Sequence, residues 1–179
     1  MAVVSGIIRV MEKAARKAGG RLRRDFGEVE HLQVSRKGPA DFVSKADQRA
    51  ERTIWDELRA ARPDWGFLME EGGEIHGAEG KPRFIVDPLD GTSNFLHGIP
   101  HFAISIALER DGEIIAGVIY EPIRDEMYWT EKGAGAYVND RRLRVSARRQ
   151  LGDAVIGTGM PHRYRAEDRT YMAILASVM

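Results

Sequence analysis

The sequence predicts an α+β domain in which two helices precede a mostly antiparallel sheet. Three observations predict it. Apolar residues recur at three- and four-residue steps up to about residue 61, the period changes to two from residue 66, and turn-forming pairs separate the later apolar runs. With 179 residues, of which 43% are hydrophobic, the chain is long enough to bury a sizeable core.

The helical pattern has two parts. A first helix is expected over residues 5–26, and Gly27 is a plausible end for it. A second helix is expected to begin at Ser44, whose hydroxyl would cap free amides, and to end at Pro63. Asp47 would then lie three residues after the cap, where the positive end of the helix dipole favours a carboxylate.

The later part of the chain is typical of a meander. Asp111-Gly112 is a strong hairpin signal, and Asn139-Asp140 predicts another turn. The expected strands are 66–69, 83–86, 101–109, 113–120, 126–130, 136–138 and 143–145.

The last segment is expected to belong to another unit. A strand over 154–157 and a helix over 167–178 would follow the meander. We therefore assign residues 1–152 to an N-terminal α+β domain and 153–179 to the beginning of a second α/β domain. Because the pattern stops at Met179 without a helix-ending residue, we expect the chain to be truncated.

Composition excludes several classes of function. Lys and Arg together number 27, as do Asp and Glu, and this balance argues against a general nucleic-acid or membrane-surface binder. The absence of cysteine excludes thiolate metal sites and a cysteine nucleophile. The longest nearly uncharged apolar stretch, 99–108, is too short to span a bilayer, and no signal-peptide pattern is present. A cytoplasmic location is expected.

The most informative residues follow the expected strand 83–86. Pro88 forces Asp87 into an extended conformation and turns the chain sharply. The carboxylates of Asp87 and Asp90 can then converge on one cation, together with the carbonyl of Leu89. Residues 91–94 resemble a helix start with free amides, which suits a phosphate. Hard oxygen ligands beside such amides favour Mg²⁺ bridging to a phosphate.

Two other acidic groups are candidates for the same site, and each has a simpler interpretation. Glu70 would emerge at the end of strand 66–69, but Glu-Glu-Gly-Gly is also typical of a solvated turn. Asp47 is also typical of a helix cap. Asp-Pro-x-Asp-Gly alone is also compatible with an ordinary turn.

Three blocks taken together carry a resemblance. Asp87-Pro-Leu-Asp-Gly-Thr-Ser-Asn-Phe95, with Asp41-Phe-Val-Ser-Lys-Ala-Asp47 and Met69-Glu-Glu-Gly72 before it, closely resembles the inositol monophosphatase family. That family belongs to the metal-dependent, lithium-sensitive phosphomonoesterases, and the resemblance spans residues 5–179. It implies a layered α-β-α-β-α sandwich, lithium inhibition and a homodimer.

The resemblance also implies roles for individual residues. Asp47 and Thr92 would orient and deprotonate the attacking water, with Glu70 as a further catalytic group. Two or three Mg²⁺ ions would be bound by Glu70, Asp87, the Leu89 carbonyl and Asp90. The phosphate ester would be held by Asp90 and by the amides of Gly91, Thr92 and Ser93.

The function implied is Mg²⁺-dependent hydrolysis of a phosphate monoester, with inositol monophosphate as the leading substrate. Fructose-1,6-bisphosphate, histidinol phosphate and a nucleotide 3′-phosphate are alternatives. A non-catalytic relative that binds RNA or protein through an exposed basic strand at 141–149 is an alternative of another class. The family's second half carries a Trp-Asp-x-Ala-Ala/Ser-Gly block whose Asp completes the metal site. Nothing here matches it, so a chain ending at Met179 is expected to be inactive by itself.

Overall fold

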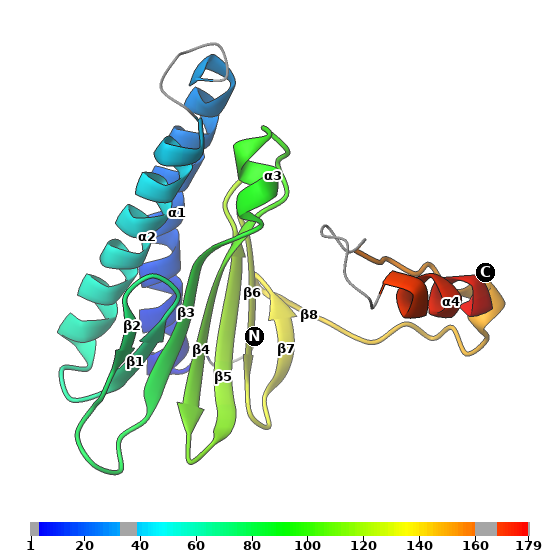
Figure 1. Ribbon diagram of the computed structural model, residues 1–179. Coiled ribbons are helices and arrows are strands. Elements are labelled where there is room, and N and C mark those ends of the chain that lie inside the picture. Colours follow the sequence, from blue (N-terminus) through cyan, green and yellow to red (C-terminus); the bar gives the residue numbers. More distant parts are fainter. Residues whose placement is uncertain (1–3, 33–38, 160–167, 179) are drawn as a thin grey trace. The chain divides into compact units, whose positions relative to one another are not determined.

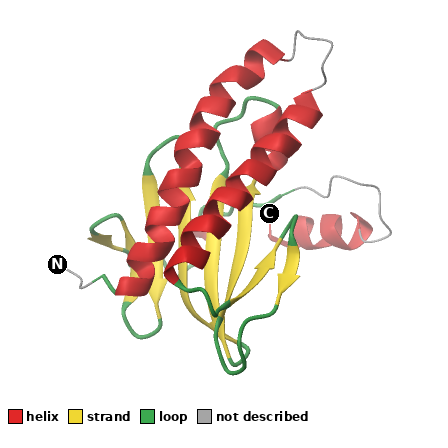
Figure 2. Ribbon diagram, turned by 90° about the vertical axis from the view of Figure 1, so that its left-hand side faces the viewer, coloured by secondary structure: helices red, strands yellow, loops and turns green. Residues whose placement is uncertain are grey.

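The computed structural model describes residues 4–32, 39–159 and 168–178. The chain divides into two compact units, Met1–Arg144 and Val145–Met179. The first unit contains two long helices, α1 (Gly6–Leu32) and α2 (Pro39–Ala61), which lie beside each other along one face of a sheet (Figure 1, Figure 2).

The sheet has eight strands in the order β2-β1-β3-β4-β5-β6-β7-β8. Within this sheet only the β1–β3 pair is parallel. The β1–β2 pair is a short antiparallel hairpin, and the strands from β3 onward form an antiparallel meander. The strands are β1 (Gly66–Met69), β2 (Gly73–Ile75), β3 (Arg83–Asp90), β4 (Ala103–Arg110), β5 (Glu113–Glu121), β6 (Glu126–Glu131), β7 (Gly135–Val138) and β8 (Arg141–Arg142).

The core lies between the helices and the sheet. Strand residues that face the helices are buried and alternate with more exposed residues, as the period of two requires. The largest side chains without solvent exposure are Ile8, Met11, Leu22, Ile54, Leu58, Phe67, Phe84, Leu89, Phe95, Ile104, Ile106 and Leu108.

The expected end of the first helix and the expected start of the second were wrong, whereas the second helix ends just before Pro63 as predicted. Helix α1 continues past Gly27 to Leu32, because Val29 extends the apolar stripe into the core. That burial outweighs the cost of an internal glycine, about 1 kcal/mol. Helix α2 begins at Pro39, which suits a first helical position. Ser44 is therefore exposed inside the helix and is not its cap.

Most of the expected strands are found, although β2 was not expected and β4 begins at residue 103 instead of 101. Strand β3 does not end at residue 86 but continues through Asp90. The expected strand 143–145 is absent, and β8 is formed by Arg141 and Arg142 instead. The turn Asp111-Gly112 is confirmed, since both residues have positive φ, 53° and 77°.

The second unit is small in its described part. It contains a 3₁₀ turn, Leu151–Asp153, and helix α4 (Asp168–Val178). The strand expected over 154–157 is absent, since these residues are irregular and exposed. The assignment of 1–152 and 153–179 to two domains stays a prediction. A search of the described helices found none with the length and apolarity that crossing a membrane requires.

Candidate functional site

The candidate site lies at the edge where the parallel strands β1 and β3 end. Met69 is paired with Val86, so Glu70 and Asp87 are the next residues along the two strands. Because the carboxyl ends of parallel strands meet at the same edge, the two side chains come together there. Figure 1 shows helix α3 (Thr92–Leu96) following β3 at this end of the sheet.

A β-bulge determines how Asp87 and Asp90 are presented. Asp87 is paired with Ser105 and Asp90 with Ala103, so three steps along β3 match two steps along β4. The extra residue places both carboxylates on the face opposite the helices, whereas Leu89 is fully buried. The Leu89 N–H donates to Asp87 Oδ1 over 3.1 Å, which stabilises the bulge.

Asp47 is buried in the middle of α2. It is 5% exposed, and its Oδ1 atom has no hydrogen-bond partner. Burial raises the pKa of Asp47 from its ordinary value of 3.8 to about 7, and the negative charge of Glu70 adds to the effect. The helix-cap interpretation of Asp47 was wrong, because α2 begins eight residues earlier.

Glu70 and Asp87 form a carboxyl pair. The pKa of Glu70 is raised by burial, by the charge of Asp87 and by its hydrogen bond to Asp87. The pKa of Asp87 is also raised by burial, although the Leu89 N–H and the Glu70 bond act in the other direction. Glu70 is exposed and lies in the turn that follows β1, as the solvated-turn interpretation expects, and this turn also places its carboxyl group beside that of Asp87.

Helix α3 supplies free amides beside these carboxylates. Its first main-chain bond runs from the Phe95 N–H to the Gly91 carbonyl, so the amides of Thr92 and Ser93 are not used by the helix. Gly91 has φ of 94°, and a Cβ atom there would lie 2.9 Å from the His101 carbonyl oxygen. The sharp turn therefore requires glycine. The Thr92 hydroxyl donates to the Leu89 carbonyl over 2.9 Å.

The donor set fits a hard divalent cation. The charges of Glu70 and Asp87 raise the pKa of Asp47, the charge of Asp87 raises the pKa of Glu70, and the buried Oδ1 atom of Asp47 lacks a hydrogen-bond partner. Such a cluster gains stability from positive charge. Among the described residues, however, no three acidic or histidine side chains are already arranged as a closed metal site. Asp90 faces solvent, and the Leu89 carbonyl is engaged by Thr92.

Sequence reasoning missed Glu51. This residue follows Asp47 by four positions on α2, is 7% exposed, and its negative charge contributes to raising the pKa of Asp47. The spacing of four, which places two carboxylates on one helix face, is the signal that could have revealed it.

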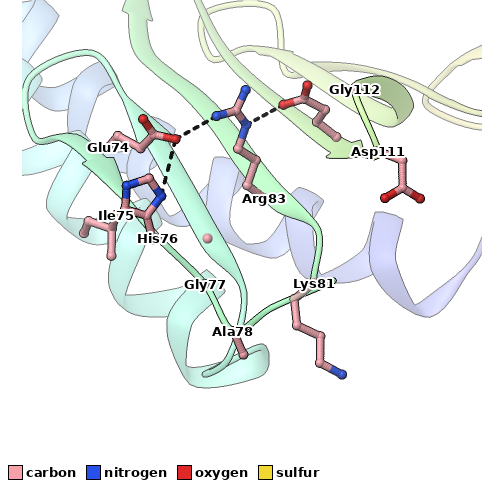
Figure 3. A pocket seen from close by; sticks show the side chains of 11 residues that line it. Glu74, Ile75, His76, Gly77, Ala78, Lys81, Arg83, Asp111 and Gly112 are labelled. Atoms are coloured by element: carbon pink, nitrogen blue, oxygen red, sulfur yellow. Dashed lines mark hydrogen bonds and ion pairs between the residues drawn. The ribbon is translucent and has the colours of Figure 1, made fainter.

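Two cavities differ in their relation to this cluster. One of about 540 Å³ is lined by Asp90, Gly91 and Asn94 and extends along β5 and β6 to Glu121. The other, of about 350 Å³, lies at the opposite end of β3, where Arg83 bridges Glu74 and Glu109 (Figure 3). No predicted site residue lines the second cavity, whereas two of them, Asp90 and Gly91, line the first.

Comparisons with known proteins identify the family of the chain. Residues 4–177 match the inositol monophosphatase family. The chain is 61% identical over 175 residues to a Rhizobium meliloti protein named inositol-1-monophosphatase, covering 98% of this chain and 66% of that protein. It is 43% identical over 161 residues to a Xylella fastidiosa protein named Nus factor SuhB, covering 89% and 57% of the two chains.

A solved structure confirms the fold. The extragenic suppressor protein suhB from Bartonella henselae superposes with a TM-score of 0.87 at 61% identity, over 98% of this chain and 67% of that one. The chain therefore belongs to the inositol monophosphatase family and has the α+β fold of its members. It spans about two-thirds of the length of these two relatives from Rhizobium and Bartonella.

Proposed function

We propose that the full-length protein hydrolyses a phosphate monoester in a Mg²⁺-dependent reaction, with inositol monophosphate as substrate. The observation that carries the proposal is the convergence of Asp47, Glu70 and Asp87 at one sheet edge, next to free amides. The relative from Rhizobium meliloti is named inositol-1-monophosphatase, which favours this substrate.

The residues have distinct proposed roles. Two or three Mg²⁺ ions, held by Glu70, Asp87, Asp90 and the Leu89 carbonyl, would acidify water and neutralise phosphate charge. Asp47, whose pKa is about 7, accepts the proton of the attacking water with help from Glu70 and the Thr92 hydroxyl. The phosphate ester would be held by Asp90 and by the amides of Gly91, Thr92 and Ser93 at the start of α3.

The test is phosphate release from inositol 1-phosphate with and without Mg²⁺. Asp87→Asn removes a proposed metal ligand. Loss of a residue that only supports a ligand costs up to about 100-fold in metal affinity or activity, so loss of the ligand itself is expected to lower phosphate release by at least that factor. Asp111→Asn is the matched control, because Asp111 lies in an exposed turn and asparagine tolerates its φ of 53°. Release that is independent of Mg²⁺, or unchanged in Asp87→Asn, would contradict the proposal.

Other substrates are separated by the same assay. The values of kcat/KM are compared for inositol 1-phosphate, fructose-1,6-bisphosphate, histidinol phosphate and a nucleotide 3′-phosphate. A higher value for one of the last three would identify that compound as the substrate in place of inositol phosphate. The resemblance also implies lithium inhibition, a homodimer and a cytoplasmic location, which complete the proposal. Inhibition by millimolar Li⁺ and a dimer mass in light scattering are expected.

RNA binding is a second candidate, favoured by the exposure of five arginines. The predicted basic strand is not formed over most of 141–149, so the arginines would contact phosphates from an irregular segment. Replacement of Arg148 and Arg149 by alanine is expected to weaken RNA binding and to reduce its salt dependence. Unchanged binding would remove this candidate. The arginines are 141, 142, 144, 148 and 149.

A further inference from the structure

Glu51 contacts the turn that presents Glu70. Its Oε2 atom accepts a hydrogen bond of 2.9 Å from the main-chain N–H of Glu71, in the turn between β1 and β2. The side chain is 7% exposed and reaches the turn from helix α2. A carboxylate that is buried at such a place costs free energy unless it is hydrogen-bonded, so this bond accounts for its position.

The turn closes tightly on this carboxylate. A Cβ atom on Gly72 would lie 3.1 Å from Glu51 Oε1 and 2.7 Å from the Met69 methyl group. Glycine at this position therefore lets the main chain pack against Glu51. Both oxygens of the carboxylate are close to the turn, one to the Glu71 N–H group and one to the space that a side chain on residue 72 would occupy.

The hydrogen bond acts on Glu70 through the peptide plane. The Glu71 N–H and the Glu70 carbonyl belong to the same rigid, planar peptide unit. Holding that N–H restricts rotation about the Glu70 Cα–C bond, and so restricts the direction in which the Glu70 side chain leaves the strand. Glu51 therefore acts on Glu70 indirectly, through the main chain of the next residue, Glu71.

We propose that Glu51 is a positioning residue, which orients the Glu70 carboxylate for Mg²⁺ through its hydrogen bond to the Glu71 amide. This inference rests on the proposed function, because Glu70 is a metal ligand only within it. Its role is the hydrogen bond rather than the negative charge, so a neutral acceptor of the same shape performs it.

The test compares Mg²⁺ binding by calorimetry in the full-length protein and in three variants. Glu51→Ala removes the acceptor and is expected to weaken Mg²⁺ binding about 10- to 100-fold. Glu51→Gln keeps an oxygen acceptor and is expected to stay within about threefold of the parent. Glu57→Ala, the control on the same helix, removes contacts with Lys13 and Lys17 only and is expected to leave binding unchanged.

Hydrogen exchange provides the second readout, which reports on the turn itself. Exchange of the Glu71 amide is expected to accelerate in Glu51→Ala and to stay slow in Glu51→Gln. Parent-like Mg²⁺ binding by Glu51→Ala would overturn this inference alone, as would equal weakening in the alanine and glutamine variants. A parent protein that binds no Mg²⁺ would overturn the proposed function and this inference with it.

Discussion

Asp87 and Asp90 lie on the same face of the sheet although they are three positions apart along the chain. In a regular strand, residues three apart point to opposite faces. The extra residue of the β3 bulge shifts the alternation by one position, so that Asp90 points to the same face as Asp87. Pro88 lies within the bulge, where it has no N–H to give to a sheet partner. The bulge therefore converts a strand that is buried on one face into a source of two carboxylates on the other.

The acidic cluster is expected to make stability fall as pH rises. A carboxyl whose pKa is higher in the folded chain stabilises folding below its unfolded pKa, and this contribution is lost as pH rises through the folded pKa. For Asp47 this loss occurs between pH 3.8 and about pH 7, and it lowers the free energy of unfolding by at most about 4 kcal/mol. Urea unfolding of the metal-free protein at pH 5 and pH 8 measures the part of this loss that falls above pH 5.

The matched variants for this pH effect are both on α2. Asp47→Asn removes the titrating carboxyl and is expected to flatten the dependence. Asp56→Asn changes an aspartate that is about half exposed and pairs only with Arg52, and it is expected to keep the slope of the parent. A parent protein that becomes more stable between pH 5 and pH 8 would contradict this prediction.

Mg²⁺ is expected to stabilise the protein more at pH 8 than at pH 5. Protons compete with the metal for Glu70 and Asp87, whose pKa values are raised by burial. A ligand at 100 times its dissociation constant adds about 2.7 kcal/mol. Thermal unfolding with and without Mg²⁺ at the two pH values provides the measurement, with Asp87→Asn as the variant that should lose the shift. An equal shift at both pH values would argue against binding at these carboxylates.

Gly91→Ala is expected to destabilise the protein and to displace the amides of α3. Its φ of 94° is unfavourable for alanine, and the new Cβ would meet the His101 carbonyl at 2.9 Å. Gly133→Ala is the control for strain alone, because φ is 83° and nothing lies within 4 Å of its Cβ position. We expect a loss of about 1–2 kcal/mol for Gly133→Ala and a larger one for Gly91→Ala. Equal losses in denaturant unfolding would show that the contact with His101 is unimportant.

Phe95→Ala is expected to release α3 from the core. Phe95 is fully buried and packs edge-on against Phe26 of α1, at 5.5 Å between ring centroids, and against Phe102, at 4.9 Å. Truncation of a buried phenylalanine costs about 3–5 kcal/mol. Since α3 carries the proposed phosphate amides, activity is expected to fall in parallel. Phe95→Leu keeps most of the volume, and a loss as large as that of the alanine variant would contradict a packing role.

Much of the fold could be predicted from local pattern. Turn pairs such as Asp111-Gly112 and the alternation in β4 and β5 are local signals, and the structure confirms them. The helix ends were harder, because Gly27 and Ser44 satisfy local rules that burial of Val29 and Val43 overrides. The short strand β2 was missed for a similar reason, since only its pairing with β1 makes it a strand.

The sequence by itself determined which residues are candidates for the chemistry, because Asp87, Asp90 and Gly91 form a local motif whose types and spacing indicate oxyanion and cation binding. Only the tertiary structure decided how distant groups join it. It buries Asp47, aligns Glu70 with Asp87 through the parallel β1–β3 pair, and brings Glu51 against the Glu71 amide. These relations depend on strand register and helix packing, which arise from contacts between residues far apart in the chain, and no local pattern encodes them.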